Sequence, residues 1–304
     1  MTSEIYPGIT LNPVAAQTPQ GLVEYELTEG DSPVILISHG GIGGVDQARV
    51  MANWVDTTRF RILSVSRPGY LGTPLESGRS LEAQADLFAA LLDHLGIDRV
   101  AVVSCSAGGP PAYMFAIRHP ERIWALIAID AVSGYYDLPE TTGPVSQMIF
   151  TTNLGQKLLK MIGEKRPDIF LKQIFQAEAY LTPKQLKAHM DYALGSVSGK
   201  AFVAAFMNTM NPYNTRKPGT DNDMAIYREM GHMAVEKITC PSLIIHGTHD
   251  ADVKFYDGVY AYENISDSER FWIEEGSHIG FWINKNGPAA QRAAADFLER
   301  KRPQ

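Results

Sequence analysis

The stretch Arg99-Val-Ala-Val-Val-Ser-Cys-Ser-Ala-Gly-Gly109 decides the fold of this chain. Its first part, Arg99–Ser104, is an apolar run typical of a strand that is buried on both faces of a parallel sheet. It then reads small-x-Ser-x-Gly and passes into a helix pattern. This order predicts a nucleophile elbow, a tight turn in which Ser104 and Gly108 must be small and Ser106 is raised above the sheet. The alternative interpretation is an ordinary strand-to-helix loop in which the serine caps the helix.

Short apolar runs recur on both sides of this elbow, each ending in small or polar residues. They are Val34–Ser38, Phe60–Val65, Ile123–Ile129, Ser242–His246 and Arg270–Glu274. Helix patterns lie between them, most clearly at Leu81–Leu95, which Ser80 can cap, and at Pro288–Arg300. Buried strands that alternate with helices predict an α/β fold with a mostly parallel central sheet and right-handed crossovers.

The alternation stops after Ile129. Three helices and no convincing strand are expected in the next hundred residues, at Thr182–Leu194, Gly199–Met210 and Asp223–Met230. The stretch Asn211–Asp223 is rich in Pro, Asn, Gly and Thr and is expected to be a loop. We therefore predict one sheet domain, made of residues 1–132 and 238–304, that is interrupted by a helical unit of residues 133–237.

A nucleophilic serine needs a base within hydrogen-bond reach. Of the eight histidines, His278 alone follows a predicted terminal strand, in Glu-Gly-Ser-His-Ile-Gly. His246 lies inside an apolar run and is expected to be a core histidine. His278 is therefore the candidate base for Ser106.

The base in turn needs an acid that orients it. Asp250 follows the strand that precedes the one carrying His278, and Asp130, at the end of an earlier strand, is its competitor. Asp252 is expected to be a surface carboxylate or a loop cap. We favour Asp250, because parallel neighbouring strands bring their carboxyl ends together and because the chain order then runs Ser, Asp, His.

A glycine-rich segment supplies the third component. The first buried strand ends in Ser38-His-Gly-Gly-Ile-Gly-Gly44, where glycines let the backbone approach a substrate closely. The N–H groups of Gly41 and Ala107 are the candidate oxyanion hole. A phosphate-binding loop would look similar, but the lysine of a Walker motif and the dinucleotide-binding spacing of glycines are both missing.

These residues give the chain its resemblance to a family. It resembles the α/β-hydrolase superfamily, in the capped branch of epoxide-hydrolase-like and esterase-like enzymes, over about residues 22–300. The segment Arg67–Thr73 is similar to the family's loop after the second strand of the parallel core. The elbow departs from the common pattern at Ser104, where glycine is usual, and at Cys105, where histidine is common. The resemblance implies that the helical unit is a cap, inserted after the sixth strand.

The identity of the nucleophile limits the classes of reaction that the protein can catalyse. A serine at the elbow excludes the aspartate-based chemistry of dehalogenases and epoxide hydrolases, and we expect a carboxylesterase-like hydrolase that works through an acyl-enzyme. Relatives that hydrolyse carbon–carbon bonds usually carry tryptophan after the catalytic histidine, and here Ile279 stands there. Carbon–carbon hydrolysis, perhydrolysis and a slow-turnover ligand receptor of the same fold stay open as alternatives.

The substrate is expected to be a small, largely apolar acyl compound. Its candidate pocket residues are Ile42, Met148, Phe206, Met207 and Ile279. No cluster of histidines and carboxylates has metal-ligand spacing, so we expect neither a metal nor a cofactor.

Composition limits the partners. The net charge of the 304-residue chain is -7, which argues against a general grip on nucleic acid. Two cysteines are too few for a disulfide framework. The first residues lack the pattern of a signal peptide, and no run reaches the roughly 20 apolar residues of a membrane span. We expect a cytoplasmic protein.

Overall fold

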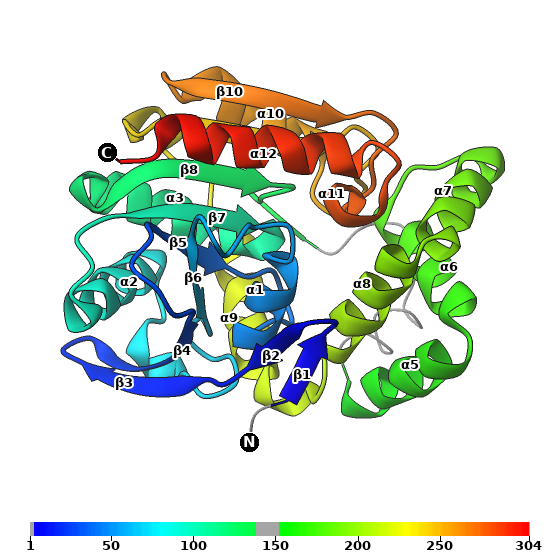
Figure 1. The fold of residues 1–304 in the computed structure, drawn as a ribbon, viewed down its shortest axis with the longest axis horizontal. Helices are drawn as coiled ribbons and strands as arrows, with labels where there is room; N and C mark the ends of the chain where they lie inside the picture. The colour runs from blue at the N-terminus through cyan, green and yellow to red at the C-terminus, as the bar shows by residue number, and fades with distance from the viewer. Residues whose placement is uncertain (1–2, 138–151, 304) are drawn as a thin grey trace.

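The computed structural model describes residues 3–137 and 152–303, and its centre is a sheet of eight strands (Figure 1). In chain order these strands are β3 (Val14–Thr18), β4 (Gly21–Leu27), β5 (Val34–Ser38), β6 (Arg61–Val65), β7 (Val100–Cys105), β8 (Ile123–Ile129), β9 (Ser242–Gly247) and β10 (Ser268–Ile273). The order across the sheet is β10-β9-β8-β7-β5-β6-β4-β3. Neighbours from β10 to β6 are parallel, whereas β3, β4 and β6 pair in antiparallel fashion. The fold is therefore the predicted α/β arrangement, with an antiparallel edge.

Helices cover both faces of this sheet. One core cluster joins the sheet to α1 (Val45–Met51) and α12 (Gly287–Lys301), and a second joins the other face to α2 (Leu81–Leu95), α3 (Gly109–Arg118) and α10 (Phe255–Asn264). Strands β5, β7 and β8 are buried along their whole length, which explains why their sequences are continuously apolar.

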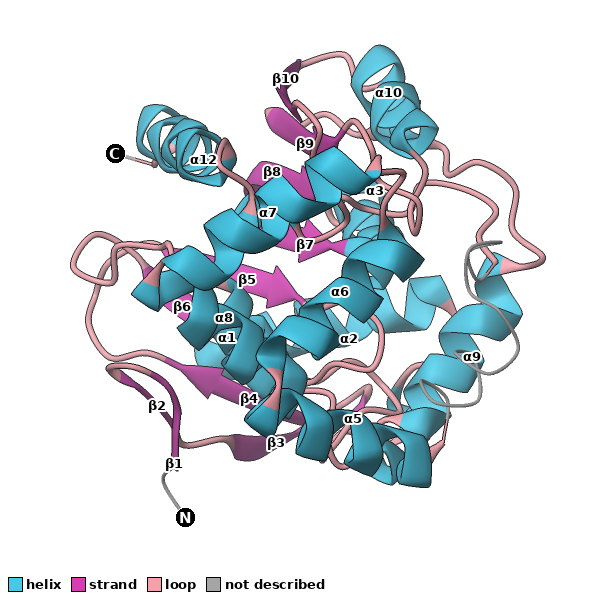
Figure 2. Ribbon diagram, turned by 90° about the vertical axis from the view of Figure 1, so that its right-hand side faces the viewer, coloured by secondary structure: helices cyan, strands magenta, loops and turns pink. Residues whose placement is uncertain are grey.

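A group of helices lies between β8 and β9 in the sequence. They are α5 (Asn153–Lys165), α6 (Pro167–Glu178), α7 (Pro183–Gly195), α8 (Val197–Asn208) and α9 (Lys217–Tyr227). Figure 2 looks at the end of the sheet where α6, α7 and α8 lie across the strands. The described part of this insertion contains no strand of the sheet, which is compatible with a cap.

Two buried arginines tie the insertion to the sheet domain. Arg67, after β6, makes two hydrogen bonds to Asp223 of α9, at 3.0 and 2.7 Å. Arg216, just before α9, donates to both carboxylate oxygens of Asp46 in α1 at 3.0 and 2.7 Å. Both guanidinium groups are buried, so these contacts fix α9 against the core.

Several segments differ from the sequence expectations; β3, β4, α1, α5 and α6 were not expected as elements. The expected loop Asn211–Asp223 already contains the first two turns of α9, because Pro218 lies in the first turn, where proline is tolerated. Gly219 is required there because a Cβ would overlap the Tyr70 ring. At the start of the chain, β1 (Ser3–Tyr6) pairs with β2 (Ile9–Leu11) outside the main sheet, and neither strand was expected. None of the described helices is long and apolar enough to span a membrane.

Candidate active site

Ser106 lies where β7 turns into α3, as the elbow motif predicts. Its φ is 54°, in the left-handed region that non-glycine residues rarely adopt. A Cβ on Gly108 would overlap the carbonyl oxygen of Ser38, so the turn admits only glycine at this position. The side chain of Ser106 lines a pocket at the carboxyl end of the sheet.

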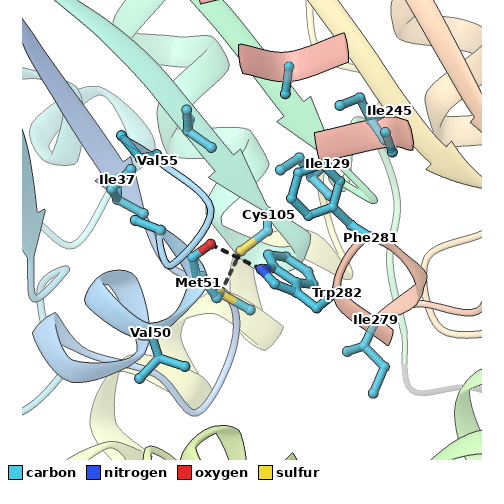
Figure 3. Close-up of a cluster of buried hydrophobic side chains, with 14 of the residues drawn as sticks. Ile37, Val50, Met51, Val55, Cys105, Ile129, Ile245, Ile279, Phe281 and Trp282 are labelled. Carbon is cyan, nitrogen blue, oxygen red and sulfur yellow. Dashed lines mark hydrogen bonds between the residues drawn. The ribbon is translucent and has the colours of Figure 1, made fainter. Parts of the chain in front are cut away.

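Cys105, the neighbour of Ser106, belongs to the core behind the elbow. Figure 3 shows its sulfur directed at Met51 and Trp282, and its Sγ lies 2.9 Å from the Met51 sulfur. Trp282 Nε1 donates to the Met51 carbonyl at 3.0 Å. Burial raises the pKa of the Cys105 thiol to about 12, so the thiol stays neutral and is a poor competitor as nucleophile.

His278 follows β10 and Asp250 follows β9, and the two side chains meet. His278 Nδ1 lies 2.8 Å from Asp250 Oδ2, and both residues are buried. The backbone N–H groups of Asp252 and Val253 donate to the other Asp250 oxygen at 2.9 and 3.0 Å, which orients the carboxylate. Within the described chain, Ser106 and His278 share a pocket but no hydrogen bond, and such contacts are often long without substrate.

Asp130, the competing acid, is used differently. Its Oδ1 accepts a hydrogen bond from the Gly247 N–H at 2.7 Å, and in the described chain it forms no hydrogen bond with His278. Burial, assisted by the nearby charge of Asp250, raises the pKa of Asp130 well above its ordinary value. The hydrogen bond of Asp130 is directed to the backbone, whereas Asp250 contacts His278 directly, which favours Asp250 as the orienting acid.

Asp130, His246 and Asp250 place possible ligand atoms within 4.8 Å of one another. However, His246 Nε2 lies 3.0 Å from the Val253 carbonyl oxygen and therefore carries a proton, and Asp250 Oδ2 faces His278. Burial lowers the pKa of His246 to about 4, so it is the neutral core histidine that the sequence indicated. These donors fit a hydrogen-bonded network better than a metal ion.

The two residues expected to form an oxyanion hole lie close together. A Cβ on Gly41 would be 3.8 Å from that of Ala107. The Gly41 N–H has no hydrogen-bond acceptor in the described part of the chain, so it is free to bind a substrate oxygen. Tyr227 of α9 fixes the turn from the other side, because its hydroxyl donates to the Ala107 carbonyl at 2.5 Å.

The pocket has a volume of about 590 Å³ and contains three of the expected lining residues, Ile42, Phe206 and Ile279. Met207 is instead 3% exposed and packs in the core, because successive residues of α8 point in different directions. Met148 lies outside the described residues. Met210 and Trp282 line the pocket as well.

Three polar residues that were not predicted to line the pocket do so. Asp252 was expected to be a surface carboxylate or a loop cap, but its side chain is 15% exposed and its Oδ2 lies 3.2 Å from His278 Nε2. The Tyr136 hydroxyl donates to the other Asp252 oxygen at 2.6 Å, and Glu178 of α6 lines the pocket beside them. No sequence signal marks Tyr136 or Glu178, because each reaches the pocket through tertiary packing.

These carboxylates set the charge of the base. Burial alone would lower the pKa of His278, but attraction to Asp250 and Asp252 outweighs burial and raises the pKa well above its ordinary value. Burial also raises the pKa of Glu178, to about 8. The free site therefore favours an imidazolium with a carboxylate on each ring nitrogen.

Comparison with known proteins identifies the family of the chain. The sequence model of the "alpha/beta hydrolase fold" family matches residues 33–285. A solved structure, an alpha/beta hydrolase fold protein from Nakamurella multipartita, is 31% identical with a TM-score of 0.89, covering 94% of this chain and 99% of that one.

Two curated relatives match over most of their length. An uncharacterized hydrolase, YcgS, from Bacillus subtilis is 27% identical over 92% of this chain and 95% of its own. A 2-hydroxy-6-oxononadienedioate/2-hydroxy-6-oxononatrienedioate hydrolase from Burkholderia vietnamiensis is 25% identical over 89% of this chain and 88% of its own.

Proposed function

Because the chain belongs to the alpha/beta hydrolase fold family and is a hydrolase, we propose that it cleaves carboxylic esters by means of Ser106, His278 and Asp250. One observation supports this most strongly. The strained elbow directs Ser106 into the same pocket that receives His278, and a 2.8 Å contact joins His278 to a buried carboxylate. Strain of this kind, on the order of 1–3 kcal/mol, usually persists where function requires it.

In the proposed reaction, neutral His278 accepts the Ser106 proton at Nε2 while Oγ attacks the ester carbonyl carbon. The carbonyl oxygen becomes an anion that the N–H groups of Gly41 and Ala107 bind. The C–O bond to the alcohol then breaks, and the alkoxide leaves with the proton from His278. Water, activated by the same nitrogen, hydrolyses the acyl-enzyme and restores Ser106.

The helices between β8 and β9 have the position of a cap in this proposal. Phe206 and Met210 from α8 and the segment after it supply apolar surface opposite the elbow. An apolar wall close to the nucleophile favours acyl chains and excludes water. The boundaries that we propose for the cap are those expected from the sequence, residues 133–237.

Carbon–carbon bond hydrolysis is the second candidate, because the Burkholderia vietnamiensis relative is named for such a substrate. Two observations count against it. Ile279 follows His278 where tryptophan is usual, and the described cationic side chains of the pocket, Lys217 and Arg228, are each paired with a carboxylate. A dianionic substrate would therefore meet no unpaired cation among the described lining residues.

Hydrolysis of p-nitrophenyl esters, with a fluorophosphonate probe to label the nucleophile, tests the proposal. Ser106→Ala should lower kcat by roughly 10³–10⁶ and abolish labelling. Ser104→Ala is the matched control, since it removes a buried hydroxyl that has no hydrogen-bond partner, and it should retain activity. Labelling at Ser104 or Cys105, or labelling of Ser106 without turnover, would contradict the proposal.

A further inference from the structure

One end of the pocket is acidic. We call Glu178, Asp252 and Tyr136 the acidic end. Asp252 stands at its centre, because one carboxylate oxygen accepts the Tyr136 hydroxyl at 2.6 Å and the other lies 3.2 Å from His278 Nε2. Glu178 completes the group from α6, at the end of the helix nearest the pocket.

Two buried carboxyl oxygens at this place have no hydrogen-bond partner in the described chain. They are Glu178 Oε2 and Asp130 Oδ2. Asp130 is 1% exposed and lines the pocket beside the acidic end. Buried polar oxygens are nearly always paired in native proteins, so orphaned oxygens that face a pocket point to a donor that arrives with a ligand.

The charges around the pocket are unbalanced in the same direction. Among the described lining residues, Lys217 pairs with Asp221 and Arg228 pairs with Asp137. Neither cation is left to compensate Glu178 or Asp252, and among the described residues His278 is the one cationic group paired with Asp252. A positively charged ligand group would restore the balance, and an anionic one would worsen it.

We propose that the substrate carries an ammonium group on its alcohol side, which binds between Glu178 and Asp252. This inference rests on the proposed esterase function. The alcohol side follows from the chemistry, because His278 Nε2 returns its proton to the leaving alkoxide and Asp252 lies next to that nitrogen. The reaction remains an ester hydrolysis that yields an acid and an amino alcohol.

Binding of the ammonium group also prepares the base. In the free protein Asp252 occupies His278 Nε2, the nitrogen that must accept the Ser106 proton. An ammonium group gives Asp252 another partner and releases that nitrogen. Glu178 is suited to assist, since burial raises its pKa to about 8 and a nearby cation would favour its ionised form. Of the remaining titratable neighbours of His278, Asp250 contacts the other ring nitrogen, Nδ1, whereas Asp130 accepts the Gly247 N–H and His246 contacts the Val253 carbonyl.

Two esters of the same shape test the proposal. We would measure kcat/KM for 2-(dimethylamino)ethyl butanoate, which is cationic at pH 7.5, and for its neutral isostere 3-methylbutyl butanoate. The native protein should prefer the cationic ester about tenfold or more. Glu178→Gln and Asp252→Asn should each bring the ratio of the two kcat/KM values, cationic ester to neutral ester, towards one. In Glu178→Gln the change should come from a higher KM for the cationic ester. Asp168→Asn, at the other end of α6 and paired with Arg166, is the control that should keep the ratio.

A second readout separates binding from a structural role. Asp252→Asn removes one anion beside His278, so the acid limb of kcat/KM for the neutral ester should move to lower pH. If neither ester is turned over, butylammonium should still protect Ser106 from the fluorophosphonate at lower concentration than butanol does.

A native ratio near one, a ratio that Glu178→Gln leaves unchanged, or equal protection by butylammonium and butanol would overturn the inference. Turnover of p-nitrophenyl esters with labelling of Ser106 would in those cases still support the esterase function. If the protein neither hydrolysed p-nitrophenyl esters nor was labelled at Ser106, the proposed esterase function would be refuted.

Discussion

Replacing Asp223 by asparagine should destabilise the protein strongly, because it leaves a buried guanidinium without its counter-charge. The Arg67 side chain is fully buried, and that of Asp223 is 5% exposed. Asp223 accepts two hydrogen bonds from Arg67 and a third, at 2.7 Å, from the Tyr70 hydroxyl. Arg67 also donates to the carbonyl of His39 at 3.1 Å, so the pair supports the loop that carries the proposed oxyanion hole.

Breaking a buried pair by removing one partner costs about 3–5 kcal/mol. The unfolding entropy is about 2.1 cal/mol/K per residue, or about 0.64 kcal/mol/K for this chain. The expected fall in Tm is therefore about 5–8 °C, measured by scanning calorimetry.

Asp221→Asn is the matched control on the same helix. Asp221 is 59% exposed and pairs with Lys217, which is 52% exposed, so its loss should cost less than about 1 kcal/mol. The double variant Arg67→Met with Asp223→Leu should recover much of the lost stability, because it removes both charges. Equal Tm values for Asp223→Asn and Asp221→Asn would refute the reasoning.

Three further predictions concern catalysis. The kcat/KM should fall as pH is lowered through a value above the ordinary histidine pKa of about 6.5. The reason is that His278 acts as a base only when neutral, and its carboxylate neighbours raise its pKa. A kcat/KM that is flat between about pH 6 and 9 would contradict this prediction. Asp250→Asn should lower kcat by about 10⁴, whereas Asp130→Asn should lower it at most about tenfold, and the reverse ranking would exchange their roles. Phe206→Leu should change KM and acyl-chain preference, whereas Met207→Leu should change mainly Tm; equal effects on KM would show that α8 is wrongly oriented.

The sequence predicts the centre of the fold well, because burial on both faces leaves a clear pattern. Val34–Ser38 and Ile123–Ile129 are strands with the expected bounds, and each is buried along its length. The edge is harder to predict. Strand β3 is mostly exposed, so its sequence Val-Ala-Ala-Gln-Thr lacks a continuous apolar run.

The residues of the candidate site also differ in how well the sequence predicts them. Ser106 was identified from local sequence, because a tight turn needs small residues at fixed positions. His278 and Asp250 could be placed from strand order alone, and the structure brings them within 2.8 Å. Asp252 could not be placed from strand order. A carboxylate two residues beyond Asp250 can face either solvent or the pocket, and tertiary packing decides which.

The arginines that hold the insertion in place also bear on the charge of the pocket. Arg67 is neutralised by Asp223 and Arg216 by Asp46, so these two buried positive charges hold α9 to the sheet. A pocket that binds a dianionic substrate needs at least one cationic side chain that is not already paired with a carboxylate of the protein. Freeing either arginine by replacing its carboxylate would leave a buried guanidinium unpaired and loosen the joint, whereas Lys217 could be freed from its exposed partner Asp221 at little cost. The attachment of the insertion therefore keeps Arg67 and Arg216 from serving as substrate-binding cations, and an anionic substrate would have to recruit Lys217 or Arg228 instead.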